Sequence, residues 1–233
     1  MSKEVLRQFI REAISSGLTY KVGEKLKKAQ EGKLGFYIKR YPSKVSVTLY
    51  DTGKLIELCR PPIEDDDGLY HFAEVAPQTI VAYIELLEAP GCGGGMEVTT
   101  SAAKDKFGPL IYDFAMAASP AGIVPDRQAI SAKARDMYKN MFDSRPDVSK
   151  TPVPEKCRTW VRSESQFLDY TYSGGTRLDV SELESNHQKA MAVISEMLDV
   201  EIRTLESQIS VAGWKSADLD VKVASKGEMY YSG

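Results

Sequence analysis

Residues 97–118 combine a strand, a turn and a helix in an arrangement that can bind an anion. Glu97 to Thr100 are typical of the end of a strand, and Gly108 and Pro109 open a segment with helical apolar spacing. The first N–H groups of a helix have no intrahelical partner and lie at the positive end of its dipole, so they suit a phosphate. Pro109 fits, because proline is favoured in the first helical turn. The pattern fits equally well an ordinary strand-to-helix connection without a ligand.

Histidines and cysteines are too few for most other site chemistries. His71 and His187 are the only histidines, which excludes a three-histidine metal site. Cys59, Cys92 and Cys157 are odd in number, lie far apart and form no CxxC pair. We therefore expect neither a disulfide framework nor a zinc site, and a chain that works in a reducing cytosol. The sequence predicts no metal cofactor.

Length and composition restrict the class of protein. The chain has 233 residues, 42% of them hydrophobic and 27% charged, as in ordinary globular proteins. We expect one domain with an appendage. The formal net charge of −3 argues against nucleic acid as a partner, because proteins that bind its phosphates are usually basic. No apolar run approaches the ~20 residues that span a bilayer, and we expect no signal peptide, so the predicted location is cytoplasmic.

The elements before the turn are predicted from periodicity. Residues 1–32 show helical spacing, which predicts an N-terminal helical segment. Residues 36–50 alternate apolar and polar side chains with a period of two, which predicts two strands. Residues 51–54 are typical of a hairpin turn that leads into a strand at 55–58. Another strand is expected at 80–87.

The elements after the turn are mostly helical. The pattern predicts a short strand at 122–124, a helix capped by Ser131 and a last strand near 167–172. A long amphipathic helix is expected over 179–210, because its apolar residues recur every three or four positions. Residues after Gly213 are weakly patterned and predict a tail.

Two stretches carry a likeness to a known family: Gly108-Pro109-Leu110-Ile111-Tyr112-Asp113, and Asp126-Arg127 with Ser131, Ala134, Tyr138 and Arg145-Pro146-Asp147-Val148. With this order of elements, the chain resembles GNAT-type N-acetyltransferases of the kind encoded by tailed bacteriophages. The resemblance implies an α+β fold, with a mixed, mostly antiparallel sheet flanked by helices and a C-terminal helical extension. It divides the chain into an N-terminal helical segment (1–32), a GNAT-like domain (33–172) and a C-terminal long helix and tail (173–233).

The resemblance implies that two central strands part beside the turn, where backbone N–H groups would hold the pyrophosphate of acetyl-CoA. Superfamily members carry (Gln/Arg)-x-x-Gly-x-(Gly/Ala) in this turn, and of the aligned Ala103, Lys106 and Gly108 only the last matches. Lys104 and Lys106 could offset this change by offering positive charge to the phosphates. The positions implied to bind the cofactor are Val98, Thr100, Lys104, Lys106, Phe107, Gly108 and Pro109.

The resemblance also implies three catalytic positions. Superfamily enzymes often use a tyrosine on the helix after the fifth strand to protonate the leaving thiolate, and Tyr138 occupies a comparable place. Glu85 or Glu97, on the central strands, could serve as a general base through water. Each position also fits an ordinary structural role. Tyr138 forms a helical packing stripe with Ala134 and Met141, and each carboxylate fits a solvated or edge site.

Two functions of different classes follow from the resemblance. The first is a GNAT-like acyltransferase that moves acetyl from acetyl-CoA to an amine of an unidentified acceptor. The second is a non-catalytic GNAT-fold virion or assembly component that binds other bacteriophage structural proteins. The chain would then be cytoplasmic in a bacterial host, or virion-associated. Helix 179–210 has more apolar residues than a surface helix needs, so it could dock on another subunit of an oligomer.

Overall fold

The computed structural model describes residues 33–60, 67–104, 107–126, 130–157, 166–174 and 180–224, with side chains as far as residue 217. The predicted N-terminal helical segment (1–32) and Lys106 lie outside the described residues, so predictions for them stay open. Within the described ranges the chain has an α+β fold, as the sequence predicts.

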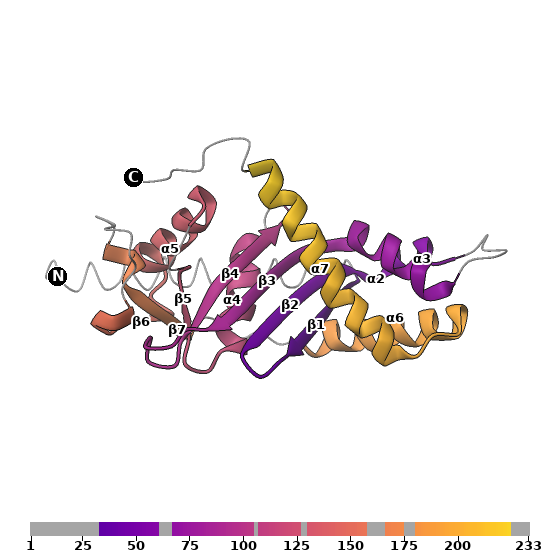
Figure 1. Ribbon diagram of the computed structural model, residues 1–233, viewed down its shortest axis with the longest axis horizontal. Helices are drawn as coiled ribbons and strands as arrows, with labels where there is room; N and C mark the ends of the chain where they lie inside the picture. Colours follow the sequence, from indigo (N-terminus) through magenta and orange to yellow (C-terminus); the bar gives the residue numbers. More distant parts are fainter. Residues whose placement is uncertain are drawn as a thin grey trace, which may run out of the picture.

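The strands of the described chain form one sheet of seven, in the order β1-β2-β3-β4-β5-β7-β6 (Figure 1). They are β1 Leu34–Arg40, β2 Lys44–Asp51, β3 Ile80–Glu88, β4 Met96–Ala103, β5 Ile123–Val124, β6 Val148–Pro152 and β7 Tyr170–Gly174. Neighbouring strands are antiparallel except β4 and β5, which run parallel. The predicted mixed, mostly antiparallel sheet is therefore confirmed.

Helices cover both faces of this sheet. They are α2 Thr52–Leu58, α3 Gly68–Val75, α4 Gly108–Ala118, α5 Ala132–Ser144, α6 Ser181–Leu198 and α7 Ile202–Ala224. Figure 1 shows α7 crossing the front of β1 to β4, while α4 lies behind the sheet. α6 packs along β1 at the edge of the sheet.

Strand β2 shows how the sheet separates its two faces. Val47 and Leu49 are fully buried in the hydrophobic cluster that includes α4. Ser46, which lies between Val45 and Val47, points to the opposite face, where its Oγ lies 2.7 Å from Oγ of Ser210 on α7. Because side chains alternate along a strand, the face under α4 is apolar and the face under α7 is partly polar.

The predicted hairpin at 51–54 and strand at 55–58 are wrong, because residues 52–58 form α2. Oδ1 of Asp51 accepts a hydrogen bond from the N–H of Lys54 at 2.9 Å and caps the helix. Aspartate is among the strongest N-cap residues, and this bond stabilises a helix where the composition equally suits a turn. Leu55 is then buried on the inner side of the helix.

The single long helix predicted over 179–210 is also wrong, because α6 ends at Leu198 and α7 begins at Ile202. Asp199 takes a left-handed conformation with φ of 53°, and its N–H donates to the carbonyl of Ser195. This is a typical helix C-terminus. α7 then continues beyond the predicted tail boundary at Gly213 to Ala224.

The apolar faces of α6 and α7 pack within the chain. They join α2, α3 and β2 in one buried cluster, which includes Tyr50, Leu55, Phe72, Ala190, Met191, Ile194, Leu205 and Ile209. Most of the apolar stripe that the sequence shows in this region is therefore buried on the sheet and on neighbouring helices, while Val193 and Ile202 stay exposed.

A disulfide joins Cys92 to Cys157, contrary to the expectation of no disulfide framework. Cys92 lies in the turn between β3 and β4, and Cys157 follows β6, so 65 residues separate the pair. The fold brings their Cα atoms to 4.7 Å, within the range that a disulfide requires. Sequence spacing could not show this contact. Cys59 is buried elsewhere, which raises the pKa of its thiol to about 11.

Gly213 lets α7 lie directly on the sheet. A Cβ atom at this position would lie 2.4 Å from Cδ2 of Tyr83 and 3.0 Å from Oγ1 of Thr48. Tyr83 and Thr48 are themselves buried, so neither side chain can move into solvent to make room. The close approach of α7 to the sheet therefore requires glycine here.

We expect Gly213→Ala to destabilise the protein by about 1–3 kcal/mol, because the added methyl group overpacks this contact. Elsewhere in a helix the same change stabilises by roughly 0.5–1 kcal/mol, since alanine has the higher helix propensity. Gly53→Ala in α2 is the matched control, because its Cβ would meet no atom closer than Asp51 Oδ1 at 3.5 Å. Urea denaturation measures both changes, and an increase in stability for both variants would contradict the packing.

Candidate functional site

The parallel ladder between β4 and β5 covers only two residue pairs, Met96 with Ile123 and Glu97 with Val124. Beyond Glu97, β4 continues to Ala103 beside β3, with no strand on its other edge among the described residues. An unpaired strand edge offers backbone N–H and C=O groups to an extended ligand. We call the place where β4 continues without β5, residues 98–103, the open edge of β4.

The open edge leads into the N-terminus of α4. The N–H of Phe107 donates to the carbonyl of Lys104 at 3.1 Å, which closes the turn. Phe107 occupies the N-cap position, where no side chain caps the helix, and Pro109 lies in the first turn. Because the first N–H groups of a helix have no intrahelical partner, the start of α4 at Gly108 is a position where backbone donors can serve an anion.

The residues at the start of α4 fit an anionic group. A Cβ atom at Gly108 would meet Met137 Cε at 3.7 Å and nothing closer, so the backbone there is accessible. Lys104 is exposed beside the turn and can offer its amine to a phosphate. Backbone donors, the helix dipole and a lysine together make a donor set suited to phosphate oxygens.

Two contacts hold the open edge of β4 in place against its surroundings. The hydroxyl oxygens of Ser101 and Tyr112 lie 3.1 Å apart, which ties β4 to the first turns of α4. Val98 is 5% exposed and packs in the cluster under α4. Thr100, half-buried, pairs with Glu85 of β3. The predicted cofactor residues of β4 therefore lie along a strand that is fixed on one side only.

Tyr138 lies in the core with 1% of its surface exposed. Its hydroxyl donates to the carbonyl of Val124 at 3.3 Å, at the last residue of β5. Its ring makes an edge contact with Tyr112, with centroids 5.6 Å apart, and a tilted contact with Tyr172 at 5.4 Å. The predicted packing role is therefore present, and the hydroxyl lies where β4 and β5 cease to pair.

The structure separates the two carboxylates proposed as general bases. Glu97 is half-buried and pairs with Val124, the residue that also binds Tyr138. Glu97 and Tyr138 are therefore both placed by Val124, the residue at which the β4–β5 ladder ends. Glu85 belongs instead to the face under α7. Its Oε2 lies 2.5 Å from Nζ of Lys44 and accepts a hydrogen bond from the hydroxyl of Tyr83 at 2.8 Å.

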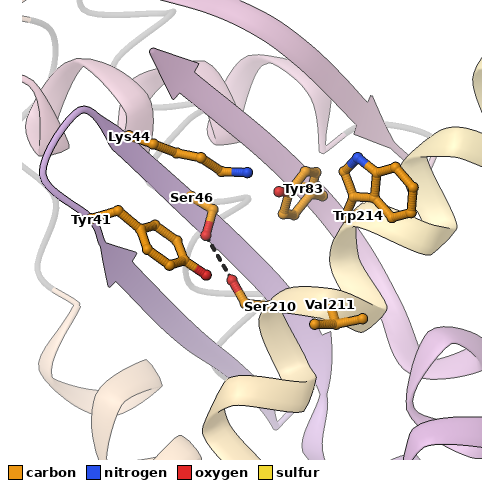
Figure 2. A pocket seen from close by; sticks show the side chains of 7 residues that line it. All are labelled: Tyr41, Lys44, Ser46, Tyr83, Ser210, Val211 and Trp214. Atoms are coloured by element: carbon orange, nitrogen blue, oxygen red, sulfur yellow. Dashed lines mark hydrogen bonds between the residues drawn. The ribbon is translucent and has the colours of Figure 1, made fainter. Parts of the chain in front are cut away.

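Lys44 and Tyr83 line a cavity beneath α7 (Figure 2). Burial raises the pKa of Tyr83 well above its ordinary value, and the charge of Glu85 adds to the effect. Tyr83 therefore stays protonated and acts as a donor. Glu85 is engaged by both neighbours, and this arrangement suits a structural ion pair better than a base at the end of β5.

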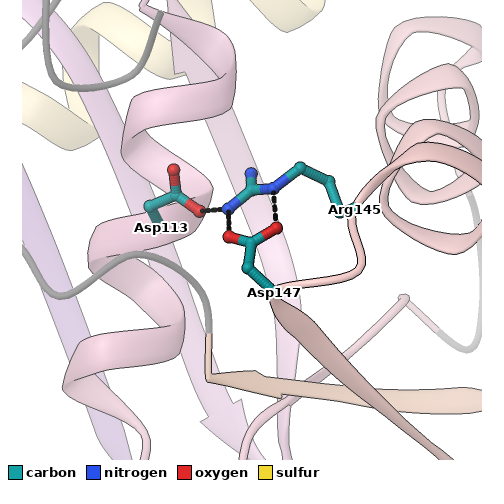
Figure 3. A network of polar contacts seen from close by, with 3 residues as sticks. All are labelled: Asp113, Arg145 and Asp147. Atoms are coloured by element: carbon teal, nitrogen blue, oxygen red, sulfur yellow. Dashed lines mark hydrogen bonds and ion pairs between the residues drawn. The ribbon is translucent and has the colours of Figure 1, made fainter. Parts of the chain in front are cut away.

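A buried arginine joins α4 to the turn before β6 (Figure 3). Arg145 Nη2 lies 3.0 Å from Oδ1 of Asp113 and 2.6 Å from Oδ2 of Asp147, and its Nε donates to Asp147 Oδ1 at 2.8 Å. Burial lowers the pKa of Arg145, but the hydrogen bonds and charges of Asp147 and Asp113 outweigh it and raise the pKa overall. The guanidinium stays charged and holds α4 against the second half of the sheet.

Asp113, Arg145 and Asp147 all belong to the two stretches that resemble the known family, but the sequence alone does not indicate that they are in contact. The available signal was Asp113, a charged residue in a helix that is otherwise apolar over residues 110–116. A carboxylate on such a helix needs a buried partner. The sequence offers several arginines, and only the fold selects Arg145. The sequence likewise does not predict the cavity under α7, because its lining residues lie far apart along the chain.

No group of three or more potential metal ligands comes together in the described part of the chain. Across those same residues, no helix is both long enough and apolar enough to cross a membrane. No family model, curated protein or solved structure matches this chain. The assignment of function therefore depends on the geometry of β4, β5 and α4.

We expect Arg145→Met to lower the free energy of unfolding by about 3–5 kcal/mol, because it leaves the buried carboxylate of Asp113 and the half-buried one of Asp147 without their cation. Arg203→Met is the matched control: Arg203 pairs with Glu201 at 3.1 Å, but its side chain is 88% exposed. An exposed pair of this kind contributes about 0–1 kcal/mol. Chemical denaturation of the two variants checks the difference, and equal losses would show that the buried contact does not hold α4.

Proposed function

We propose that this chain is a GNAT-like acyltransferase that binds acetyl-CoA along the open edge of β4 and at the start of α4. The observation that carries the proposal is the coincidence of two features at one place. Parallel strands cease to pair after Glu97, and the same strand leads directly to a helix without a side-chain cap. The family resemblance of residues 108–113 adds support.

The two features suit different parts of one ligand. The pantetheine arm of coenzyme A is extended and carries amide groups, which can hydrogen-bond to an unpaired strand edge. Its pyrophosphate is an anion of the kind that a helix N-terminus holds, here at Gly108 and Leu110, with Lys104 nearby. When bound, acetyl-CoA supplies a thioester whose acetyl group can pass to an amine. In this proposal the thioester lies near the end of β5.

Tyr138 and Glu97 are the residues that could move protons at that point. Tyr138 carries a hydroxyl proton at the carbonyl of Val124 and could give it to the leaving thiolate. Glu97 lies across the ladder from Val124 and could accept a proton from the attacking amine through water. Glu85 is excluded from this role in the proposal, because Lys44 and Tyr83 already engage its carboxylate.

A second function is favoured by one observation. The hydroxyl of Tyr138 is already bonded within the core, and the residue packs between Tyr112 and Tyr172. A tyrosine used only for packing would be found in the same place. The alternative is a GNAT-fold assembly component without turnover, which could still retain the ligand site.

Binding of acetyl-CoA is tested by calorimetry with the wild type and Gly108→Glu. We expect the wild type to bind, and the variant to bind about tenfold more weakly or worse, because a carboxylate at the helix start repels phosphate. The fold has room for the side chain at this position. Gly53→Glu makes the same charge change on α2 and should bind as the wild type does.

Absence of both heat and thermal stabilisation at about 1 mM acetyl-CoA would overturn the proposal, because a ligand of the folded state must stabilise it. Unchanged affinity in Gly108→Glu, with binding in the wild type, would show that the ligand lies elsewhere.

Turnover separates the acyltransferase from the assembly component. We expect Tyr138→Phe to slow the release of free coenzyme A about a hundredfold without weakening acetyl-CoA binding, because it removes a proton donor and leaves the ring. Tyr172→Phe is the control, since its hydroxyl bonds to the carbonyl of Phe167, away from β5. Release detected with a thiol reagent gives the rate. Binding without release would favour the second function, and an unchanged rate in Tyr138→Phe would show that Tyr138 is not the proton donor.

A further inference from the structure

A small cavity opens between the β1–β2 hairpin and α7, on the face of the sheet opposite α4 (Figure 2). Its volume is about 180 Å³. Seven residues line it: Tyr41, Lys44, Ser46, Tyr83, Ser210, Val211 and Trp214. They come from the turn between β1 and β2, from β2, from β3 and from α7, so the cavity exists only because α7 is docked.

The floor of the cavity is polar and deeply buried. Ser46, Tyr83 and Ser210 are 1%, 1% and 5% exposed. The hydroxyls of the two serines lie 2.7 Å apart and point toward each other in Figure 2. Hydroxyls can rotate to donate to a ligand, so this floor can meet a polar group that enters from the mouth.

The charge at the cavity favours an anion. Lys44, with a third of its side chain exposed, reaches over the opening, and Lys39 lies on the same face with its amine 2.8 Å from Oγ of Ser207. Both amines also lie over the ring of Tyr41, at 5.1 and 5.7 Å from its centroid. Glu85 is the one carboxylate that contacts Lys44 in the described chain, and Lys44 and Tyr83 already occupy its Oε2. Two cations against one engaged carboxylate leave a positive field.

The walls of the cavity are aromatic and exposed. Tyr41 is 42% and Trp214 48% exposed, and both are among the most exposed large apolar side chains of the described chain. Val211, at 39%, continues this surface on α7. Exposed aromatic walls around a polar floor are typical of small-molecule sites. A cavity of roughly 150 Å³ holds a benzene ring, so the present volume suits one ring.

We propose that this cavity binds a single-ring aromatic carboxylate, with the ring between Tyr41 and Trp214 and the carboxylate on Lys44 and the serine hydroxyls. Charge-assisted hydrogen bonds to the carboxylate give the site its preference for an anion. The site does not depend on the proposed acetyl-CoA site, because the sheet separates it from α4. Either proposal can therefore fail while the other stands.

Calorimetric titration with benzoate tests the proposal on the full chain. We expect saturable binding with a Kd of roughly 0.1–1 mM, the range that so small a ligand can reach. Benzamide keeps the ring without the charge, and acetate keeps the charge without the ring. Each should bind about tenfold more weakly or worse. Absence of saturable binding of benzoate, or equal binding of benzamide, would overturn the assignment.

Two variants test the residues. Trp214→Ala should weaken benzoate about tenfold by removing one wall, whereas Val193→Ala, which removes an equally exposed apolar side chain from α6, should not. The double variant Lys44→Gln with Glu85→Gln removes both charges together and leaves neither ion unpaired. It should reduce benzoate affinity to that of benzamide. Thermal melts show that each variant is folded. Wild-type affinity for benzoate in either folded cavity variant would contradict the site.

Discussion

The fold depends on a narrow junction in the sheet, where a ladder of two residue pairs joins β4 to β5 and a single pair joins β5 to β7. On one side of this ladder β1 to β4 form an antiparallel half, and on the other β5, β7 and β6 form a smaller one. Because this ladder is short, it contributes few backbone hydrogen bonds, and other contacts must hold the two halves of the sheet together. Three of them cross the junction: the N–H of Met96 donates to the carbonyl of Gly122, Arg145 binds Asp113, and Cys92 is bonded to Cys157.

Two of these contacts, the Met96 bond and the disulfide, lie at the paired end of β4, and this asymmetry gives the candidate site its form. The paired end of β4 is fixed by the ladder and the disulfide, while the open edge runs beside β3 and is tied to α4 by the bond from Ser101 to Tyr112. A strand held rigidly along one edge keeps its other edge preorganised for a ligand without having to move. On the far face, Gly213 brings α7 onto the sheet and creates a separate cavity, so the two faces can serve different ligands.

Much of the fold follows from the sequence, because period-two alternation indicates β1 and β2, a short apolar run indicates β3, and helical spacing indicates α4 and α5. The strand-turn-helix of the candidate site is also predictable, since Gly108 and Pro109 are local signals. The errors have two physical causes. Some elements depend on a single local contact or conformation: the cap by Asp51 starts α2, and the left-handed conformation of Asp199 ends α6. Long-range partners decided the others, such as the cysteine pair, which nothing local specifies.

The central claim is that the open edge of β4 and the start of α4 together form the ligand site. Amide hydrogen exchange, measured with and without saturating acetyl-CoA, tests this claim most directly because it reports on the backbone groups themselves. The account predicts slower exchange at residues 98–103 and 108–111 when the ligand is bound, with little change in β1 or α6. Binding that leaves both segments unprotected, or that protects only residues elsewhere, would contradict it.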